Sequence, residues 1–517
     1  MSPFEVIADE SELSNEDTEE EAEEKTKVSK RRKYNIPISK ETVKHIDKLV
    51  GTTLIHTAHE AKIDPVLTPA TREENEVIER AKVKAKLGHL TLDSFQKESV
   101  LSLIRGINTM LVVPTGSGKT AVMQIALEAL REMKAIEDGV GVCLQPLNSI
   151  LREKSSDHSH VKSVFITMSG EAESEGVSIS NTVEELENGG FGIIYAHAES
   201  LLSDIGSRFI KKIKKKILLV ILDEAHMSLN EFWGKEEMRE EMKNAPSSLK
   251  IQGRFHKAPM LIMTATATLS NIKDLKKLAG IDNSPCTIIS MSPVLSNHIY
   301  MKVERPPSNR FYSVISDTGE IVKHGLKDLL EMLYLQQFID SIKSGSNPKR
   351  AMIFTTLELE CEINDFLIES LKDCDIIRDP DTVPWIVTNS VAGDVTTEKI
   401  RMRMKNVFCL VTSTVSLLGV NFNDFDYVIT TSPFRQHHSL LQAVGRSGRR
   451  LPDGGRKVSA LYALYNATSI RVGLPGLDPS VRKFYSFPGC LKMFIHKKFS
   501  EDPFKPCDTM CCSNCFT

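Results

Sequence analysis

Long apolar runs are missing from this 517-residue sequence, since none approaches the roughly 20 residues that span a bilayer. The start of the chain also lacks the pattern of a secretory or transit leader, because its first 24 residues are acidic. Glycine is limited to 28 residues, which excludes a collagen-like chain. With 41% hydrophobic and 26% charged residues, the composition argues against a largely disordered chain. We therefore expect an intracellular globular protein of about three domains, with no membrane partner.

Acidic charge is concentrated at the start of the chain. Residues 1–26 hold eleven acidic residues and one basic residue, a net −10 that leaves +7 for the rest of a chain whose total is −3. We expect residues 1–39 to form a disordered tail that is a candidate site for a protein partner. The basic string at 27–33 is interpreted as a nuclear localisation signal, a nucleic-acid arm or a solvated charge run. The nucleus is thus the first expected location and the cytoplasm the second.

Short apolar runs that alternate with helical patterns begin at about residue 88. Buried strands that alternate with helices predict an α/β fold with parallel sheets. We predict two tandem lobes of this kind at 88–296 and 297–470, after a helical extension at 40–87 and before a small C-terminal helical module at 471–517. The predicted strands lie at 110–113, 141–144, 191–195, 217–222, 260–263, 351–354, 385–387, 407–411 and 427–429.

A glycine-rich turn typical of phosphate binding follows the first of these strands and opens a predicted helix at 121–133. Backbone N–H groups in such a turn, together with the helix dipole, attract phosphate oxygens. Lys119 can reach the β- and γ-phosphates of a nucleotide, and the Thr120 hydroxyl can bind Mg²⁺. The strand before and the helix after disfavour a chance glycine-rich turn. The predicted nucleotide-binding residues of this turn are Thr115, Gly116, Ser117, Gly118, Lys119 and Thr120.

Two adjacent carboxylates, Asp223 and Glu224, follow the apolar strand at 217–222. The carboxyl ends of parallel strands are where α/β proteins bind ligands. Asp223 can hold Mg²⁺ directly or through water, and Glu224 can polarise an attacking water as a general base. A solvated strand end is the alternative interpretation, which the phosphate-binding turn about 100 residues upstream disfavours. The sequence therefore predicts a nucleotide hydrolase.

Several segments resemble the motifs of superfamily 2 helicases, and their detail resembles the RecQ family. Residues 223–226 look like the DEAH box and residues 263–267 resemble the family's TAT coupling motif. Residues 411–421 resemble motif V, and residues 442–449 match motif VI. The resemblance covers about residues 88–517 and implies two RecA-like lobes that share ATP and Mg²⁺. It also implies that Gln96, which precedes the phosphate-binding turn by a RecQ-like interval, reads the adenine edge.

The same resemblance implies roles for residues around the cleft between the lobes. Arg446 and Arg449 would stabilise the transition state, with Arg449 the best candidate for an arginine finger. An aromatic loop after the DEAH box would stack on a base. The residues expected to contact DNA are Pro146, Ser149, Phe232, Trp233 and Thr412. The residues expected to couple the cleft to DNA are His226, Thr264, Thr266 and Gln442.

Five of the ten cysteines lie within the last 28 positions. In a reducing compartment such a cluster indicates a metal site rather than a disulfide knot, and its spacing is similar to the zinc module of the RecQ family. Four thiolates form a structural zinc site, so we expect one Zn²⁺ that fastens the C-terminal helices to the second lobe. The predicted ligands are Cys490, Cys507, Cys512 and Cys515, with Cys511 able to replace Cys512.

These features predict an ATP-dependent DNA helicase that acts on single-stranded and forked DNA in repair or recombination. Its 3′–5′ polarity is implied by the resemblance alone. Asp93 stands where the family has an arginine, and the chain ends two residues after Cys515 without the winged-helix domain of many RecQ proteins. One alternative is therefore a DNA-stimulated ATPase that remodels DNA without processive unwinding. An RNA helicase is the other, and the oligomeric state is not predicted.

Overall fold

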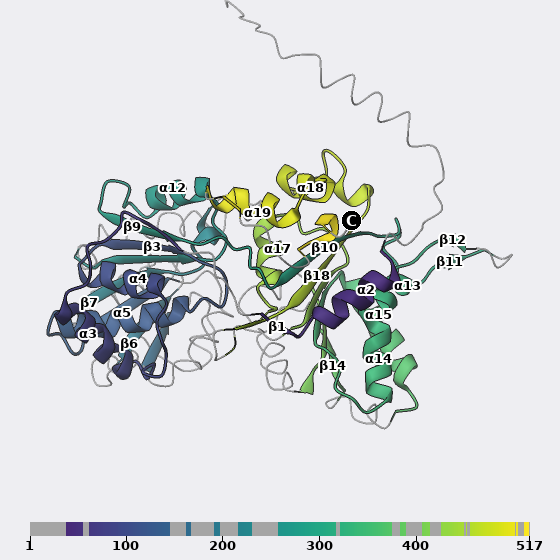
Figure 1. Ribbon diagram of the computed structural model, residues 1–517, viewed down its shortest axis with the longest axis horizontal. Coiled ribbons are helices and arrows are strands. Elements are labelled where there is room, and N and C mark those ends of the chain that lie inside the picture. Colours follow the sequence, from purple (N-terminus) through teal and green to yellow (C-terminus); the bar gives the residue numbers. More distant parts are fainter. Residues whose placement is uncertain are drawn as a thin grey trace, which may run out of the picture. The chain divides into compact units, whose positions relative to one another are not determined.

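A mainly parallel sheet of eight described strands forms the centre of the first lobe (Figure 1). Among the described strands of this sheet, β2 alone runs antiparallel to its neighbour. The strand order is β2 (Lys62–Asp64), β9 (Cys286–Ser290), β3 (Asn108–Val112), β8 (Met260–Thr264), β7 (Ile217–Leu222), β4 (Val140–Leu144), β6 (Phe191–Ala196) and β5 (Lys162–Ile166). The computed structural model describes residues 38–54, 61–144, 162–166, 191–196, 216–229, 257–316, 321–374, 383–388, 406–413, 425–448, 451, 455–501, 503–504 and 511–515.

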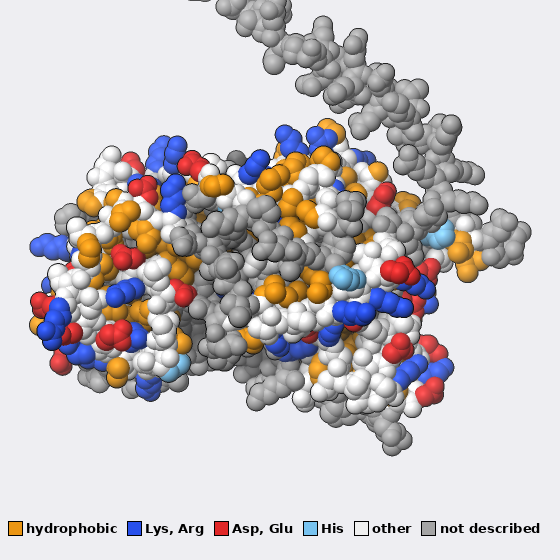
Figure 2. Space-filling model, viewed as in Figure 1, with side chains coloured by type: hydrophobic (Ala, Val, Ile, Leu, Met, Phe, Trp, Pro, Cys, Tyr) orange, Lys and Arg blue, Asp and Glu red, His pale blue; other side chains and the backbone are white. Residues whose placement is uncertain are grey.

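Helices cover both faces of this first sheet, so its central strands are buried along their whole length. Because side chains alternate between the faces of a strand, Leu111 packs into one core and Met110 into the other. Figure 2 shows acidic and basic side chains interspersed over the outer helices, as expected for a solvated face. One face carries α3 (Arg72–Lys84), α4 (Ser94–Ile104) and α5 (Lys119–Met133), and the other carries α12 (Leu269–Leu278).

The second lobe is built on a six-stranded sheet whose described strands are all parallel. Both predicted sheets are thus confirmed as parallel α/β structures. The strand order is β10 (His298–Glu304), β18 (Ser459–Tyr465), β16 (Tyr427–Thr430), β13 (Ala351–Phe354), β15 (Cys409–Thr412) and β14 (Trp385–Val387). One face packs on α13 (Lys327–Leu330), a π-helical turn (Glu331–Leu335), α14 (Gln336–Lys343) and α15 (Leu357–Leu371), and the other on α17 (His437–Val444), α18 (Pro479–Ser486) and α19 (Leu491–Phe499).

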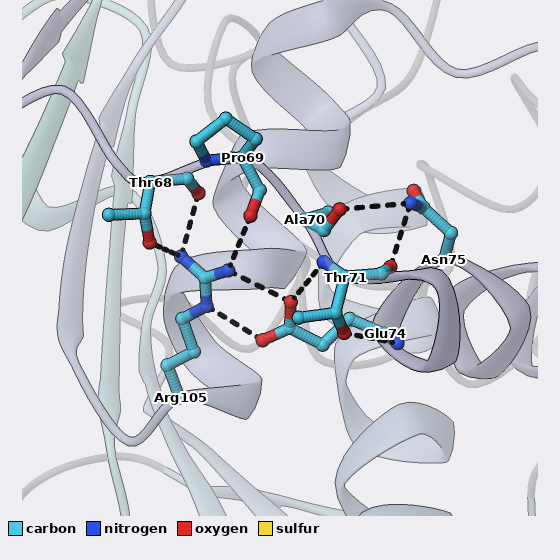
Figure 3. A network of polar contacts seen from close by, with 7 residues as sticks. All are labelled: Thr68, Pro69, Ala70, Thr71, Glu74, Asn75 and Arg105. Atoms are coloured by element: carbon cyan, nitrogen blue, oxygen red, sulfur yellow. Dashed lines mark hydrogen bonds and ion pairs between the residues drawn. The ribbon is translucent and has the colours of Figure 1, made fainter.

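The extension expected at 40–87 is divided between the two lobes. Its first part, α2 (Lys40–Leu49) and β1 (Thr53–Leu54), belongs to lobe 2, where β1 pairs with β17 (Arg456–Lys457). Its second part, β2 and α3, belongs to lobe 1, where Glu74 binds Arg105 at the end of α4 (Figure 3). No described helix is long and apolar enough to cross a membrane.

Candidate functional site

The predicted phosphate-binding turn connects β3 to α5. Gly116 and Gly118 adopt left-handed backbone conformations, with φ of +77° and +81°, which glycine adopts without a steric penalty. A Cβ atom on Gly118 would lie 2.4 Å from Nε2 of Gln96, so a larger residue there would have to displace the Gln96 amide. The N-terminus of the 15-residue helix α5 opens at Lys119, directly after this turn. The helix dipole and the turn's N–H groups therefore act at one place, as anion binding requires.

Two side chains pack against this turn. Lys119 Nζ donates hydrogen bonds to the carbonyl oxygens of Val113 (3.1 Å) and Pro114 (3.2 Å). Gln96 is buried, and its Nε2 donates to the carbonyl of Ser117 at 2.9 Å. The Oε1 atom of Gln96 accepts from the backbone N–H of Asp93 at 2.9 Å. Asp93 is the N-cap residue of α4, a position that favours aspartate, which gives a structural reason for an acid at this place in the sequence.

The predicted carboxylate pair lies at the end of β7. Asp223 is buried, and its Oδ1 accepts from the backbone N–H of Glu224 at 2.9 Å. Glu224 has a left-handed backbone conformation, with φ of +46°. A residue other than glycine in this region costs about 1–3 kcal/mol, and such residues are enriched at functional sites. The side chain of Glu224 is 29% exposed, so it can reach solvent while Asp223 is sheltered. Asp223 and the Thr120 hydroxyl at the start of α5 are the residues that could hold Mg²⁺.

A buried histidine connects the two lobes. His226 Nδ1 lies 2.9 Å from Oγ1 of Thr264 in lobe 1, and its Nε2 lies 3.2 Å from Nε2 of Gln442 in lobe 2. Burial lowers the pKa of His226 to about 3, so the ring is neutral. A neutral imidazole has one donor and one acceptor nitrogen. Because the Gln442 amide nitrogen is a donor, Nε2 accepts from it and Nδ1–H donates to Thr264.

The second lobe closes the site from the other side. A small cavity is lined by the phosphate-binding turn, by Thr266 and by the end of α17. Gly445, just after α17, contacts the turn so closely that an added Cβ would lie 2.9 Å from Cβ of Thr115. Arg446 follows in the same loop, whereas Arg449 lies outside the described residues. The structure therefore brings the turn, the coupling residues Thr264, Thr266 and Gln442, and the start of the arginine motif together.

Four predicted DNA contacts, Pro146, Ser149, Phe232 and Trp233, also lie outside the described residues. Thr412, the fifth, is buried at the carboxyl end of β15, where its hydroxyl accepts from Thr388 Oγ1 at 2.6 Å. On the neighbouring strands, Thr431 Oγ1 donates to Thr355 Oγ1 at 2.9 Å. A row of threonine hydroxyls thus follows the carboxyl ends of four adjacent strands. Sequence reasoning missed all of these threonines except Thr412, although a threonine after each apolar run was the available signal.

Four cysteine sulfurs gather at the C-terminus within 4.8 Å of one another, on Cys490, Cys511, Cys512 and Cys515. Tetrahedral zinc with bonds of about 2.3 Å separates its sulfurs by about 3.8 Å, so the group has the dimensions of a zinc site. The pair distances of 3.3 Å (Cys490 to Cys511) and 3.4 Å (Cys512 to Cys515) are slightly tighter. Hydrogen bonding from Cys511 lowers the pKa of the Cys512 thiol to about 5. Cys511 thus joins the group together with Cys512, and Cys507 lies outside the described residues.

The cysteine group is fastened to the edge of the second sheet. The backbone N–H of Tyr300 in β10 donates to the carbonyl of Cys511 at 3.2 Å, and Tyr300 forms a parallel bridge with Cys512. Lys302 Nζ donates to the carbonyls of Tyr485 (3.1 Å) and Phe487 (2.7 Å) at the C-terminal end of α18. The module therefore has its own contacts with lobe 2 apart from any metal.

Comparison with known protein families agrees with the two-lobed fold and its phosphate-binding turn. Residues 93–275 match the DEAD/DEAH box helicase family, and residues 331–450 match the helicase conserved C-terminal domain. The protein therefore contains two RecA-like helicase domains in one chain, the arrangement of a superfamily 2 helicase.

Among curated relatives, ATP-dependent DNA helicase Q-like 5 of Arabidopsis thaliana is 24% identical over 371 residues, which cover 69% of this chain and 34% of the relative. ATP-dependent DNA helicase RecQ of Haemophilus influenzae is 21% identical over 203 residues, 39% of this chain and 30% of the relative. The chain thus spans about a third of the length of these relatives.

Solved structures share the fold. The DUF1998 helicase MrfA bound to DNA has a TM-score of 0.57 at 15% identity, covering 87% of this chain and 55% of that one. The DEAD-box helicase Mss116 bound to ssRNA and UDP-BeF has a TM-score of 0.54 at 14% identity, covering 77% of this chain and 76% of that one.

Proposed function

We propose that the protein is an ATP-dependent 3′–5′ DNA helicase or translocase of RecQ type, which hydrolyses ATP between its two lobes while it moves on single-stranded DNA. The observation that carries this proposal is the hydrogen-bonded path from Thr264 through His226 to Gln442, which joins the lobes beside the phosphate-binding turn. RecQ-like relatives at 21–24% identity support the DNA substrate and the RecQ type. We keep a nuclear location as a proposal based on the basic residues at 27–33.

Each lobe would contribute different groups to hydrolysis. Phosphoryl transfer is mainly positioning and stabilisation of charge. Lys119 and the N–H groups of the turn would bind the phosphates, and Glu224 would orient the attacking water. Mg²⁺, held by Thr120 and Asp223, would neutralise phosphate charge. Arg446 and Arg449 would stabilise the charge that develops in the transition state, so hydrolysis would require both lobes. Because His226 contacts both lobes, a change at the cleft would reach Thr264 and Thr266.

Substitution of the catalytic residues tests the hydrolytic site. We expect Lys119→Ala to abolish ATP turnover, because it removes the charge at the phosphates. Glu224→Gln should lower kcat by roughly 10²–10⁴-fold, the usual contribution of a general base, while ATP binding is retained. Steady-state ATPase assays and binding of a fluorescent ATP analogue measure the two effects, and Glu76→Gln on the outside of α3 is the control. Turnover that persists in Glu224→Gln would refute its assignment as the base.

A strand-displacement assay tests the substrate and the mechanical output. Forked duplex DNA with and without ATP is compared with ATPase stimulation by single-stranded DNA and by single-stranded RNA. Displacement of the fork together with stronger stimulation by DNA supports the proposal. ATP hydrolysis without displacement would instead favour a protein that binds and remodels DNA. Preferential stimulation by RNA would favour an RNA helicase, and the likeness to the RNA-bound Mss116 makes this comparison necessary.

We also propose that Cys490, Cys511, Cys512 and Cys515 bind one structural Zn²⁺, in place of the predicted set that contained Cys507. Elemental analysis of the purified protein should give one zinc per chain. Cys515→Ser should lower this content and the melting temperature together, whereas Cys361→Ser, an exposed cysteine of α15, should change neither. A metal-free preparation that is fully folded would remove the proposal.

A further inference from the structure

The segment that joins the two lobes, residues 291–297, is packed into the molecule. Val294 and Asn297 are 1% and 0% exposed, respectively, and Leu295 is also buried. This segment, called the connector below, runs from the end of β9 to the start of β10. Connections between moving domains usually lie on the surface with few contacts. Such thorough burial indicates that the connector has fixed neighbours on both sides.

Helix α19 of the C-terminal module holds one side of the connector. Lys492 Nζ donates to the carbonyl of Ser296 at 3.0 Å, and His496 Nδ1 lies 2.9 Å from Oγ of Ser292. Lys492 and His496 are themselves buried, at 0% and 2% exposure. Burying an ammonium group is costly unless it is hydrogen-bonded. These contacts therefore bind α19 and the connector firmly to one another.

The other side of the connector holds the loop that carries Arg446. Asn297 Nδ2 donates to the carbonyls of Gly448 (3.1 Å) and Lys457 (2.7 Å). Gly448 has φ of +67°, and an added Cβ would lie 2.3 Å from Nδ2 of Asn297. Next to Asn297, His298 Nε2 lies 3.3 Å from the carbonyl of Ser447. The end of the connector is thus packed directly beneath the arginine loop, defined here as residues 445–448.

We propose that α19 is a positioning element for the arginine loop. Lys492 and His496 hold the connector, and Asn297 at its end holds Gly448, two residues after Arg446. This inference rests on the proposed ATP hydrolysis. A charged group that acts on the transition state must be placed accurately, since a displacement of about 1 Å can cost about 100-fold in rate. Lys492 would therefore influence kcat although it belongs to the C-terminal module.

The test compares two lysines that bind backbone carbonyls of the same region. Lys492→Met keeps an unbranched side chain that is one atom shorter, and it removes the hydrogen bond to the connector. Lys302→Met is the matched control, because Lys302 also ties the module to lobe 2 but its hydrogen bonds go to Tyr485 and Phe487. For each variant we measure the melting temperature, the zinc content, kcat and KM of the DNA-stimulated ATPase, and the affinity for a fluorescent ATP analogue.

We expect Lys492→Met to lower kcat about 10-fold or more while nucleotide affinity stays within about twofold, because an interaction made only in the transition state is lost. Lys302→Met should lower the melting temperature and leave kcat unchanged. Asn297→Ala should also lower kcat, and its effect should not multiply with that of Lys492→Met if both act along one path.

Equal kcat values in Lys492→Met, Lys302→Met and the wild type would overturn the inference. If Lys492→Met does not fold, Asn297→Ala decides alone, and a wild-type kcat in that variant overturns the inference. Absence of ATPase activity in the wild-type protein would refute the proposed function instead, so the two failures are distinguishable.

Discussion

At the scale of single residues, burial sets the protonation of His226 and of two histidines in α17. Burial lowers the pKa of His226, His437 and His438 to about 3, 4 and 2. The neutral form of His226 is required for its path to Gln442, because only an unprotonated Nε2 can accept a hydrogen bond. The connection between the lobes therefore does not titrate near neutral pH.

The same burial makes the fold sensitive to acid. The unfolded chain binds a proton at each histidine below about pH 6.5, whereas the folded protein does not until its lower pKa is reached, so stability falls as pH drops through this window. His437 packs against the rings of Phe484 and Phe494, which suits an apolar replacement. We expect His437→Leu to reduce the loss of stability between pH 7.5 and pH 5 by about 2 kcal/mol. Thermal denaturation at both pH values measures this, and an unchanged pH dependence would contradict it.

At the scale of elements, one ion pair anchors the second part of the extension to lobe 1 (Figure 3). Arg105 Nε and Nη2 donate to the two carboxylate oxygens of Glu74 at 2.7 Å and 2.8 Å. Arg105 Nη1 also donates to the carbonyl of Thr68 at 2.9 Å, and Glu74 accepts from the N–H of Thr71 at 2.8 Å. The Arg105 hydrogen bonds lower the pKa of Glu74 to about 2, so this carboxylate stabilises the fold whenever it is charged.

Removing this charge should loosen the extension. A pKa lowered from 4.5 to about 2 corresponds to roughly 3 kcal/mol, present above pH 4.5 and lost as pH falls toward 2. We expect Glu74→Gln to destabilise lobe 1 by about 2–3 kcal/mol at pH 7, with a difference from wild type that shrinks below pH 4.5. Glu76→Gln on the same helix is the control, since its pair with Arg72 is exposed and worth under about 1 kcal/mol. Urea denaturation at pH 7 and pH 3.5 compares them.

Elements with a strong local signal were predictable from sequence. All nine strands expected from apolar runs are present, and the helix expected at 121–133 is α5. β18 was missed because its alanines and leucines favour helices locally, and only its pairing with β10 and β16 makes it a strand. β2 was missed because it is short and polar.

Contacts distant in sequence explain what was missed at the site. The turn, the carboxylate pair and the coupling residues each follow a local motif. The hydrogen bond between Asn297 and Gly448 joins residues about 150 positions apart, and no local sequence pattern predicts it. Likewise, the adjacent Cys511 and Cys512 offered a choice between two ligands, whereas the fold brings both sulfurs into one group.

At the scale of the whole molecule, the chain passes between the lobes twice. Residues 38–54 complete lobe 2 before the chain builds lobe 1, and the connector then returns it to lobe 2. Residues 38–54 form part of the core of lobe 2, because Ile46 and Val50 are buried there at 0% and 3% exposure. Tyr427 Oη also donates to Oδ1 of Asp47 at 2.5 Å, which ties α2 to the central sheet.

Lobe 2 is therefore discontinuous in the sequence. A single break in the chain cannot separate the two lobes as complete domains. A fragment that starts at residue 297 would expose the apolar surface of lobe 2 that α2 covers, and it would be prone to aggregate. Grafting residues 38–54 ahead of residue 297, or co-expressing them as a peptide, would restore that cover. A domain exchange that uses lobe 2 of this protein must carry both pieces.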